Sequence, residues 1–439
     1  MTTPISPMLG VIVALSIGIA VLFMAGTRYL VYRLTDRQTT VRAAPAGAFV
    51  IPALPVHLLW PIGRTLALIG VMAIGVGVIL LRFVFGIGAV TNLSDHFPWG
   101  IWIGFDVMGG VALGAGAFVI AATAHILRIE RFEPLVRPAI LTGLLGYLLV
   151  IAGLMVDLGR PYNVWRPLVH WQYHSPLWEV GCCVATYTTV LLIEFLPVML
   201  ERVNKFEAVT RRLPTVGLYR LLRRTALVFV VLGVVLSTLH QSSLGSLWVL
   251  VPEKLHPLWY SLYLPVFFWL SAVAVGLSMT IVESTLSSKA FKRGLELHLL
   301  ADLGKAAAVV LCIYLIAKAA DLIARDAWTL LFQPSVEAAA YWVEVTLGVI
   351  VPAILFALAP VRRRPWLLFS AALLVVVFGV VMNRLNISIV GLLAFTGPIY
   401  VPSWMEIAVS LALVTLGVIA FGLAAKYLPV FPEEGEHSG

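Results

Sequence analysis

Five side chains that can exchange protons or hydrogen bonds with a ligand interrupt the long apolar stretches of this chain. They are Asp106, Tyr147, Glu179, His240 and Glu283. A charged side chain at mid-membrane costs about 2.5 to 3.5 kcal/mol on insertion scales, so each carboxylate there needs a partner or a function. A carboxyl group shielded from water holds its proton more tightly, and histidine and tyrosine both donate and accept hydrogen bonds. The five residues therefore predict a buried polar site that can handle protons.

Each of the five residues also has a purely structural explanation, and these alternatives stay open. Asp106 can pair with an arginine or cap a neighbouring helix, and Tyr147 can be an ordinary core residue. Glu179 lies in the first turn of its expected helix, where the positive helix end stabilises a carboxylate by about 0.3 to 1 kcal/mol. His240 can be a satisfied histidine at a helix end, and Glu283 a boundary charge. Because Asp106, Glu179 and His240 fall at similar depth, we favour a common site.

A polar and aromatic segment from Asp157 to Gly181 separates two apolar runs and carries Glu179 into the second of them. Its aromatic side chains suit the headgroup layer of a membrane, and its prolines break any continuous helix. These residues are Tyr162, Trp165, Trp171, Tyr173 and Trp178, with Pro161, Pro167 and Pro176. We expect a lateral segment that covers the polar site. An aromatic belt that only anchors the chain is the alternative.

Composition decides the class of protein. Hydrophobic residues make up 61% of the 439 residues and charged residues only 12%, which is far less polar than a soluble globule. The net charge of +8 comes from short basic clusters between apolar runs, as membrane topology requires, and this excludes nucleic acid as a partner. Cys182, Cys183 and Cys312 lie in apolar segments, so we expect no disulfide framework and no iron–sulfur cluster in this chain.

Apolar windows long enough to cross about 30 Å of hydrocarbon predict an all-α polytopic membrane protein with about eleven transmembrane helices. The windows lie near residues 8–32, 63–88, 100–127, 136–156, 177–200, 223–244, 258–283, 301–324, 339–360, 366–383 and 404–425. The eighth window contains Lys318 and Asp321. Because these two residues are three positions apart on one helix face, we expect them to neutralise each other.

The basic residues predict the topology. Of the 30 lysines and arginines, 22 fall on one side of the expected helices. Six fall in connections on the other side: Arg82, Arg160, Arg166, Lys254, Arg325 and Arg384. The richer side is cytoplasmic by the positive-inside rule, which puts the N-terminus outside, the C-terminus inside and the lateral segment outside. The membrane is then the inner, cytoplasmic membrane of the cell.

His125 and His240 lie at opposite ends of their helices and cannot share an iron, so we expect no haem.

Several short motifs make the chain similar to the NrfD/polysulfide reductase membrane-subunit family, and within it to the Hyb-type, haem-free "cytochrome b" subunits of periplasmic nickel–iron hydrogenases. The resemblance covers roughly residues 63–430, and its most specific part is the block around His240. The motifs are Phe97-Pro98-Trp99-Gly100 with Asp106, Leu135-Val136-Arg137-Pro138, Asp157-Leu158-Gly159-Arg160, Trp178-Glu179, Leu239-His240-Gln241-Ser242-Ser243, His256-Pro257-Leu258-Trp259 and Ile281-Val282-Glu283.

The resemblance implies a quinone-binding subunit built on two four-helix bundles, near residues 97–244 and 258–384, followed by a last helix near 404–425. The quinone, a menaquinone or a ubiquinone, would bind in the first bundle. Its pocket would be lined or flanked by Asp106, Tyr147, Trp178, Glu179 and His240, and Glu283 would lie on a proton route from the cytoplasm. The helix near 8–32, with the linker to residue 62, is extra relative to the usual pattern.

The same resemblance implies the partners. A periplasmic ferredoxin-like iron–sulfur subunit would donate electrons, and the small and large subunits of a nickel–iron hydrogenase would carry out the hydrogen chemistry. The sequence leaves open whether two such complexes form a dimer. One alternative is a quinol-oxidising subunit of a polysulfide, nitrite or molybdopterin reductase. A second alternative, a proton or solute transporter without a redox partner, lacks the visible inverted repeat and paired broken helices typical of that class.

Overall fold

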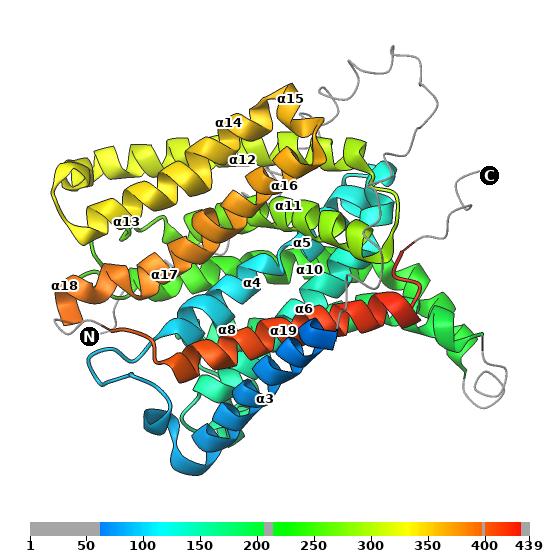
Figure 1. The fold of residues 1–439 in the computed structure, drawn as a ribbon, viewed down its shortest axis with the longest axis horizontal. Coiled ribbons are helices and arrows are strands. Elements are labelled where there is room, and N and C mark those ends of the chain that lie inside the picture. The colour runs from blue at the N-terminus through cyan, green and yellow to red at the C-terminus, as the bar shows by residue number, and fades with distance from the viewer. Residues whose placement is uncertain (1–61, 206–213, 397–399, 432–439) are drawn as a thin grey trace. The chain divides into compact units, whose positions relative to one another are not determined.

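The computed structural model describes residues 62–205, 214–396 and 400–431. Within these ranges, ten helices are long and apolar enough to cross a membrane (Figure 1). The expected all-α polytopic architecture is confirmed, and each of the ten corresponds to one predicted window. The eleventh window, near 8–32, and the linker that follows it lie outside the described residues.

The described chain divides into two compact units, which we treat separately. The first unit comprises residues 68–240 with the described residues from 396 onward, and the second comprises residues 62–67 and 241–395. Helix α10 runs from one unit into the other, since it spans Thr215–Val249.

Apart from α10, the first unit contains five spans. The second of them is a single membrane crossing made of several short helices that alternate between π and α geometry. The elements are α3 (Ile62–Phe85), η2 (Trp102–Gly109), α4 (Gly110–Leu113), α5 (Gly116–Ala121), η3 (Ala122–Ile126), α6 (Glu133–Asp157), α8 (Pro176–Val203) and α19 (Trp404–Tyr427). Short helices connect them: η1 (Ile87–Ala89), η4 (Glu130–Phe132), η5 (Pro161–Asn163) and α7 (Arg166–Val169).

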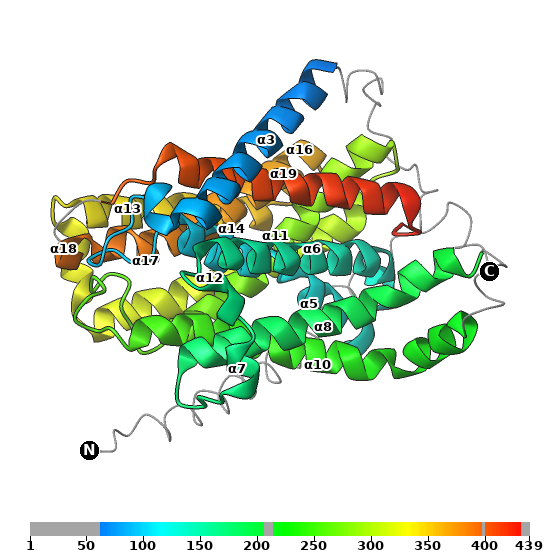
Figure 2. The ribbon, with the colours of Figure 1, turned by 90° about the horizontal axis from the view of Figure 1, so that it is seen from below.

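Small residues let the helices of the first unit approach closely. A Cβ atom added at Gly143 of α6 would lie 2.5 Å from Ala117 of α5, and one added at Gly75 of α3 would lie 2.2 Å from Ala412 of α19. Figure 1 shows α3 and α19 side by side, and Figure 2 shows α8 running beside α10. Such close contacts are how transmembrane helices gain packing energy, because lipid removes the hydrophobic driving force between them.

The second unit contains the remaining spans, and two of them also include π-helical turns. They are α11 (Leu264–Phe291), α12 (Leu297–Ala324), α13 with η7 and α14 (Val336–Val345, Thr346–Ile350, Val351–Ala357), and α16 with η8, α17, η9 and α18 (Pro365–Leu374, Val375–Val381, Met382–Ser388, Val390–Leu392, Leu393–Thr396). The connecting helices are η6 (Ala327–Phe332) and α15 (Ala359–Arg362). The two π segments cross at Gly348 and Gly379, where an added Cβ would lie 2.3 to 2.6 Å from the opposite backbone.

Several helix limits differ from the predicted windows, for example the start of α10 at Thr215 and the end of α11 at Phe291. Two further differences change where motif or charged residues lie. The seventh window was expected to begin at residue 258, but α11 begins at Leu264 because residues 252–263 form turns ahead of Pro265. The tenth window was expected to end at residue 383, but the helical stretch continues to Thr396, which puts Arg384 inside the unit with 1% of its surface exposed. Arg384 had been assigned to an outer connection, and that assignment is wrong.

The Phe97-Pro98-Trp99-Gly100 motif is held by the start of α19. Glu406, 1% exposed, accepts hydrogen bonds from the backbone amides of Asn92 and Ser403 and from the Tyr400 hydroxyl. The Tyr400 ring stacks on Phe97 at 4.8 Å between ring centroids. Gly100 lies against the same ring, since a Cβ atom there would lie 2.2 Å from Tyr400 Oη. The motif therefore shapes a tight entry to the crossing that carries Asp106.

Candidate functional site

The structure brings Tyr147 of α6 and His240 of α10 into contact in the interior of the first unit. Tyr147 Oη lies 3.0 Å from His240 Nδ1, and both side chains are fully buried. Their rings are 5.5 Å apart between centroids. These two residues are 93 positions apart in the chain, so the contact depends on the packing of α6 beside α10.

Two neighbours extend this pair. The Tyr187 ring of α8 meets the Tyr147 ring edge-on, with 4.7 Å between centroids and an interplanar angle of 82°. The buried hydroxyl of Ser237, on α10, lies close enough to the hydroxyls of Tyr147 and Tyr187 to interact with both. Its distances and angles to them do not meet the criteria for a hydrogen bond. The sequence analysis overlooked Tyr187 and Ser237. Tyr187 lies eight residues after Glu179, about two helical turns, and that spacing was the available signal.

His240 has one ring nitrogen without a hydrogen-bond partner in the described part of the chain. Nε2 is buried and has no hydrogen-bond partner among the described residues. When the Tyr147 hydroxyl donates to Nδ1, Nε2 carries the proton and becomes a donor. A buried polar atom without a partner is costly, so native structures normally provide one. A ligand carbonyl oxygen would satisfy His240 Nε2.

Asp106 belongs to a different contact in the same unit. It lies in the π-helical segment η2, is 7% exposed, and accepts a hydrogen bond of 2.6 Å from Ser410 Oγ of α19. Gly114, eight residues further along the crossing, faces the Tyr147 ring, which places Asp106 roughly 12 Å from that contact along the helix axis. The partner of Asp106 is a serine on α19, not an arginine.

Trp178 and Glu179 lie in the first turn of α8. The Ser175 hydroxyl caps this helix by accepting from the Trp178 amide, and the Trp178 indole donates a 2.6 Å hydrogen bond to the Pro167 carbonyl. Trp178 thereby ties the lateral segment to α8. Glu179 is half-buried and lies roughly 12 Å along the helix from Tyr187.

The lateral segment between α6 and α8 forms the short helices η5 and α7, which agrees with the breaks predicted from its prolines. Many of its large apolar side chains are exposed in the isolated chain: Tyr162, Trp165, Leu168, Val169, Trp171 and Tyr173. Its role as a cover over the site stays a prediction.

Glu283 lies on α11, in the second unit. It is 8% exposed, and its Oε1 atom has no hydrogen-bond partner in the described part of the chain. It is therefore a buried carboxyl group, as the sequence suggested, and its place on a proton route stays a prediction.

The second unit also contains a buried ionic cluster that corrects one expectation. Lys318 does not pair with Asp321. Its Nζ atom lies 2.7 Å from Glu344 Oε1 of α13, whereas Asp321 pairs with Arg325 at 2.7 Å and accepts from Ser261 Oγ at 2.8 Å. Side chains at i and i+3 can meet, but here each finds a better-oriented partner, one of them on another helix.

Glu344 is the centre of this cluster and was missed by the sequence analysis. Its carboxylate also accepts hydrogen bonds from Trp259 Nε1 at 2.9 Å, Asn383 Nδ2 at 2.8 Å and Asn386 Nδ2 at 2.9 Å. The nearby Arg384 guanidinium donates to Asn383 Oδ1 and to Ser271 Oγ. The sequence did contain a signal for Glu344, because this residue is a carboxylate within the apolar window of residues 339–360.

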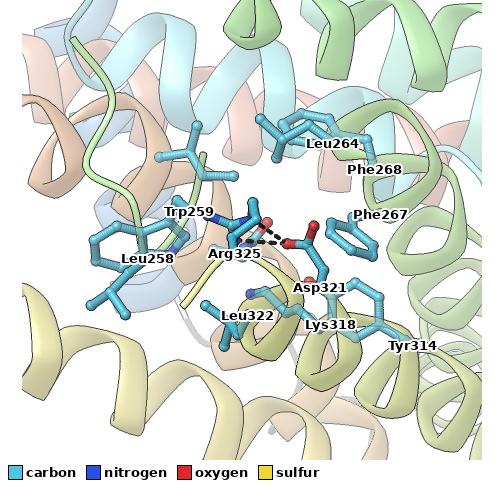
Figure 3. Close-up of a pocket in the computed structure, with 12 residues that line it drawn as sticks. Leu258, Trp259, Leu264, Phe267, Phe268, Tyr314, Lys318, Asp321, Leu322 and Arg325 are labelled. Carbon is cyan, nitrogen blue, oxygen red and sulfur yellow. Dashed lines mark hydrogen bonds and ion pairs between the residues drawn. The ribbon is translucent and has the colours of Figure 1, made fainter. Parts of the chain in front are cut away.

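A small cavity lies beside the cluster, among Leu258, Phe267, Tyr314, Lys318 and Asp321 (Figure 3). Figure 3 shows Asp321 and Arg325 joined across it, with Lys318 beside them. The space holds about one water molecule. It is too small for an organic ligand, so we do not regard it as a quinone pocket.

Comparison with known proteins identifies the family. The model of the polysulphide reductase, NrfD family matches residues 89–396, which is more than half of the chain. The chain belongs to the NrfD family. Its match includes Asp106, Tyr147, Glu179, His240 and Glu283, so the candidate site lies within the part of the chain that defines this NrfD protein.

Three relatives of this NrfD protein cover most of its length. A protein of Nitratidesulfovibrio vulgaris is 41% identical over 381 residues, covering 84% of this chain and 94% of the relative. The menaquinone reductase integral membrane subunit of the same organism is 32% identical, covering 80% and 87%. The probable Ni/Fe-hydrogenase 2 b-type cytochrome subunit of Escherichia coli K12 is 31% identical, covering 82% and 91%. Membership in a family of membrane subunits of reductase and hydrogenase complexes agrees with the resemblance seen in the sequence.

Proposed function

We propose that this NrfD protein is the quinone-reacting membrane subunit of a respiratory nickel–iron hydrogenase complex, with its quinone site at Tyr147 and His240. The observation that carries the proposal is the fully buried pair of these side chains, with His240 Nε2 unpartnered among the described residues. The names of two relatives support it, since one is a menaquinone reductase subunit and the other a probable hydrogenase subunit. Menaquinone is accordingly the first quinone to test.

The donor set fits a quinone. Reduction of a quinone to a quinol consumes two electrons and two protons, and its two carbonyl oxygens need hydrogen-bond donors. His240 Nε2 can donate to one oxygen, and a tyrosine hydroxyl, which can rotate, can donate to the other. Full burial keeps bulk water away from these donors, which strengthens their hydrogen bonds to the oxygens. His240 can pass on its Nε2 proton and recover it by way of the chain's other proton-carrying groups.

The remaining predicted residues take supporting places in this proposal. Glu179, half-buried in the first turn of α8, would deliver protons or orient the ligand from the end of the helix, and Trp178 would hold the lateral segment above it. Asp106 would flank the pocket through the contact with Ser410. Glu283 would serve a proton route from the cytoplasm within the second unit.

Electrons would arrive from a ferredoxin-like iron–sulfur subunit at the outer face, with the small and large hydrogenase subunits beyond it. We place the N-terminus outside and the C-terminus in the cytoplasm because the basic residues concentrate on one side. The exposed aromatic residues of the lateral segment would then face the donor subunit. If protons come from the cytoplasm while electrons come from outside, each turnover separates charge across the inner membrane.

Substitutions in the purified complex test the proposal. His240→Ala, Tyr147→Phe and Glu179→Gln are each expected to reduce hydrogen-dependent reduction of a soluble naphthoquinone by about 100-fold or more, the usual contribution of a positioned proton donor. Hydrogen-dependent reduction of an artificial dye by the partner subunits should be unchanged. His125→Ala, an exposed histidine of the same unit, is the matched control. Full quinone turnover in both His240→Ala and Tyr147→Phe would reject the site.

A further inference from the structure

One face of α8 carries a polar stripe of which the motifs and the candidate site account only for Glu179 and Tyr187. Glu179, Tyr187, Glu194 and Glu201 follow one another at intervals of eight, seven and seven residues. At 3.6 residues per turn, all four fall within about 80° of the helix circumference. Three carboxyl groups on one side of a transmembrane helix are costly in lipid, so this arrangement needs an explanation.

Glu194 is the carboxyl-bearing member of the stripe that lies furthest from both ends of α8. It is nine residues from the Val203 end of α8, which corresponds to roughly 13 Å of helix. Its Oε1 atom is buried and has no hydrogen-bond partner among the described residues. In that part of the chain no cation forms a salt bridge with it. A buried carboxyl group without a cation is stable in its neutral, protonated form.

Glu194 and Tyr187 line the same spot on α10. A Cβ atom built at Gly233 would lie 3.7 Å from Glu194 Oε1 and 3.5 Å from Tyr187 Cε2. The absence of a side chain at Gly233 therefore lets both groups reach the interface between α8 and α10. From Gly233, Ser237 and His240 follow at four and seven residues on the same face of α10, so His240 lies about two turns away.

The polar groups continue from Tyr187 to the candidate site. The Tyr187 ring contacts the Tyr147 ring, the Ser237 hydroxyl lies near both tyrosine hydroxyls, and Tyr147 contacts His240 Nδ1. Hydroxyl groups can donate and accept at once, so they can pass a proton on without holding a charge. This series of neighbouring polar groups, from Tyr187 through Ser237 and Tyr147, ends at His240 Nε2.

The other end of the stripe reaches the surface of the unit. Glu201 forms a salt bridge of 3.1 Å with Arg137 near the start of α6, and the two side chains are 35% and 41% exposed. Glu201 lies two turns from Glu194, roughly 10 Å along α8. A short chain of hydrogen-bonded waters can bridge such a gap.

We propose that Glu194 is a proton-relay residue, which carries protons between the membrane surface at Glu201 and Arg137 and the Tyr147–His240 pair through Tyr187. The inference rests on the proposed quinone site and names the source of its protons. Because the Val203 end of α8 lies on the side rich in basic residues, those protons would be cytoplasmic. The route runs within the first unit and does not require Glu283.

The proton transfers balance in each turnover. When His240 gives up a proton, Tyr147 donates its hydroxyl proton to Nδ1 and takes one from the Tyr187 and Ser237 hydroxyls. Neither Glu194 Oε1 nor the Tyr187 hydroxyl has a hydrogen-bond partner among the described residues, so Glu194 releases its proton to Tyr187 through a bridging water. Glu194 is then reprotonated from the surface at Glu201. The first passage protonates one quinone oxygen through His240, and the second protonates the other oxygen through a tyrosine hydroxyl. Two protons have then entered the quinol and every side chain holds its starting number of protons. His240 carries its proton on Nδ1 and must return to the Nε2-protonated form before the next turnover. The two electrons come from the iron–sulfur donor.

The test uses the purified complex with its co-purified electron-transfer partner, reduced benzyl viologen as the electron source and 2,3-dimethyl-1,4-naphthoquinone as the acceptor. Glu194→Gln should lower turnover by about 100-fold, and the remaining rate should rise as the pH falls, because protons from water become limiting. Glu194→Asp, which keeps the carboxyl group, should restore most of the turnover. Glu130→Gln, an exposed carboxylate of the same unit, should behave as the parent protein.

A second measurement does not depend on turnover. The infrared band of a protonated carboxyl group should be present in the parent complex and reduced in Glu194→Gln. Viologen oxidation with artificial acceptors should show that the variant complex assembles. Parent-like turnover and pH profile in Glu194→Gln, together with loss of turnover in His240→Ala, would overturn the relay and leave the quinone site intact. Full turnover in His240→Ala would overturn the quinone site itself.

Discussion

The buried pair of Lys318 and Glu344 provides a stability test of the second unit. Replacing Glu344 by glutamine keeps the shape of the side chain and one carbonyl acceptor, which can serve Trp259 and Asn386 at the Oε2 position. The amide nitrogen then takes the Oε1 position, which faces Asn383 and Lys318. The replacement removes the negative charge that faces Lys318 Nζ at 2.7 Å, where the two side chains are 8% and 1% exposed. The substitution therefore leaves a buried ammonium group without its counter-charge.

The magnitude follows from that burial. Removing one partner of a buried ion pair typically costs about 3 to 5 kcal/mol, because the remaining charge is uncompensated. Taking about 2 °C per kcal/mol, the lower end for a unit of this size, the melting temperature should fall by about 6 to 10 °C. In the double variant Lys318→Met with Glu344→Gln, no unpaired charge remains, so at least about 2 kcal/mol should be recovered.

Thermal unfolding of the detergent-purified protein measures these effects, with the four members of the cycle compared under one condition. Glu253→Gln, an exposed carboxylate of the same unit, is the control for loss of a negative charge. The reasoning would be refuted if Glu344→Gln melted within 1 °C of the parent protein, or if the double variant were less stable than Glu344→Gln alone.

Two other predictions concern loops outside the spans. Gly100→Ala should destabilise the first unit by about 1 to 3 kcal/mol, since the added Cβ would lie 2.2 Å from Tyr400 Oη. The control is Gly88→Ala, which has open space around the added Cβ and should have the melting temperature of the parent protein. Burial lowers the pKa of His256, whose Nδ1 accepts from the Leu258 amide. Because the unfolded chain then binds the proton more readily, stability should decline as the pH falls through the ordinary histidine pKa of about 6.5. His256→Asn should flatten that decline in melting curves recorded against pH, and an unchanged slope would contradict the assignment.

The positions of the helices were predictable because hydropathy is a local property. A span such as residues 404–425 was expected from its apolar length, and α19 occupies Trp404–Tyr427. The limit at residue 258 failed because turns precede Pro265, and the limit at residue 383 failed because a charged residue lies inside the helical stretch. Arg384 was read as part of a connection, although its charge is accommodated by Asn383 and Ser271 within the unit.

The candidate site was predictable in its residue types and only partly in its contacts. Tyr147 and His240 were both singled out, and the structure places them together. Asp106 was grouped with Glu179 and His240 by depth, but its carboxylate contacts Ser410, which lies 304 positions away in the chain. Depth in the membrane can be counted along a helix, whereas the direction in which a side chain faces depends on which helices pack beside it.

By itself, the sequence determined the all-α polytopic class, the extents of the spanning helices and the family, because apolar length, basic clusters and short motifs are properties of contiguous residues. Only the tertiary structure decided that Lys318 pairs with Glu344 and not with Asp321, and that Tyr187 and Glu194 join the face leading to Tyr147. These pairings unite residues from different helices, or select one helix face among several. The physical reason is that a buried polar group takes the partner that packing brings within hydrogen-bond distance, and sequence spacing alone does not contain that distance.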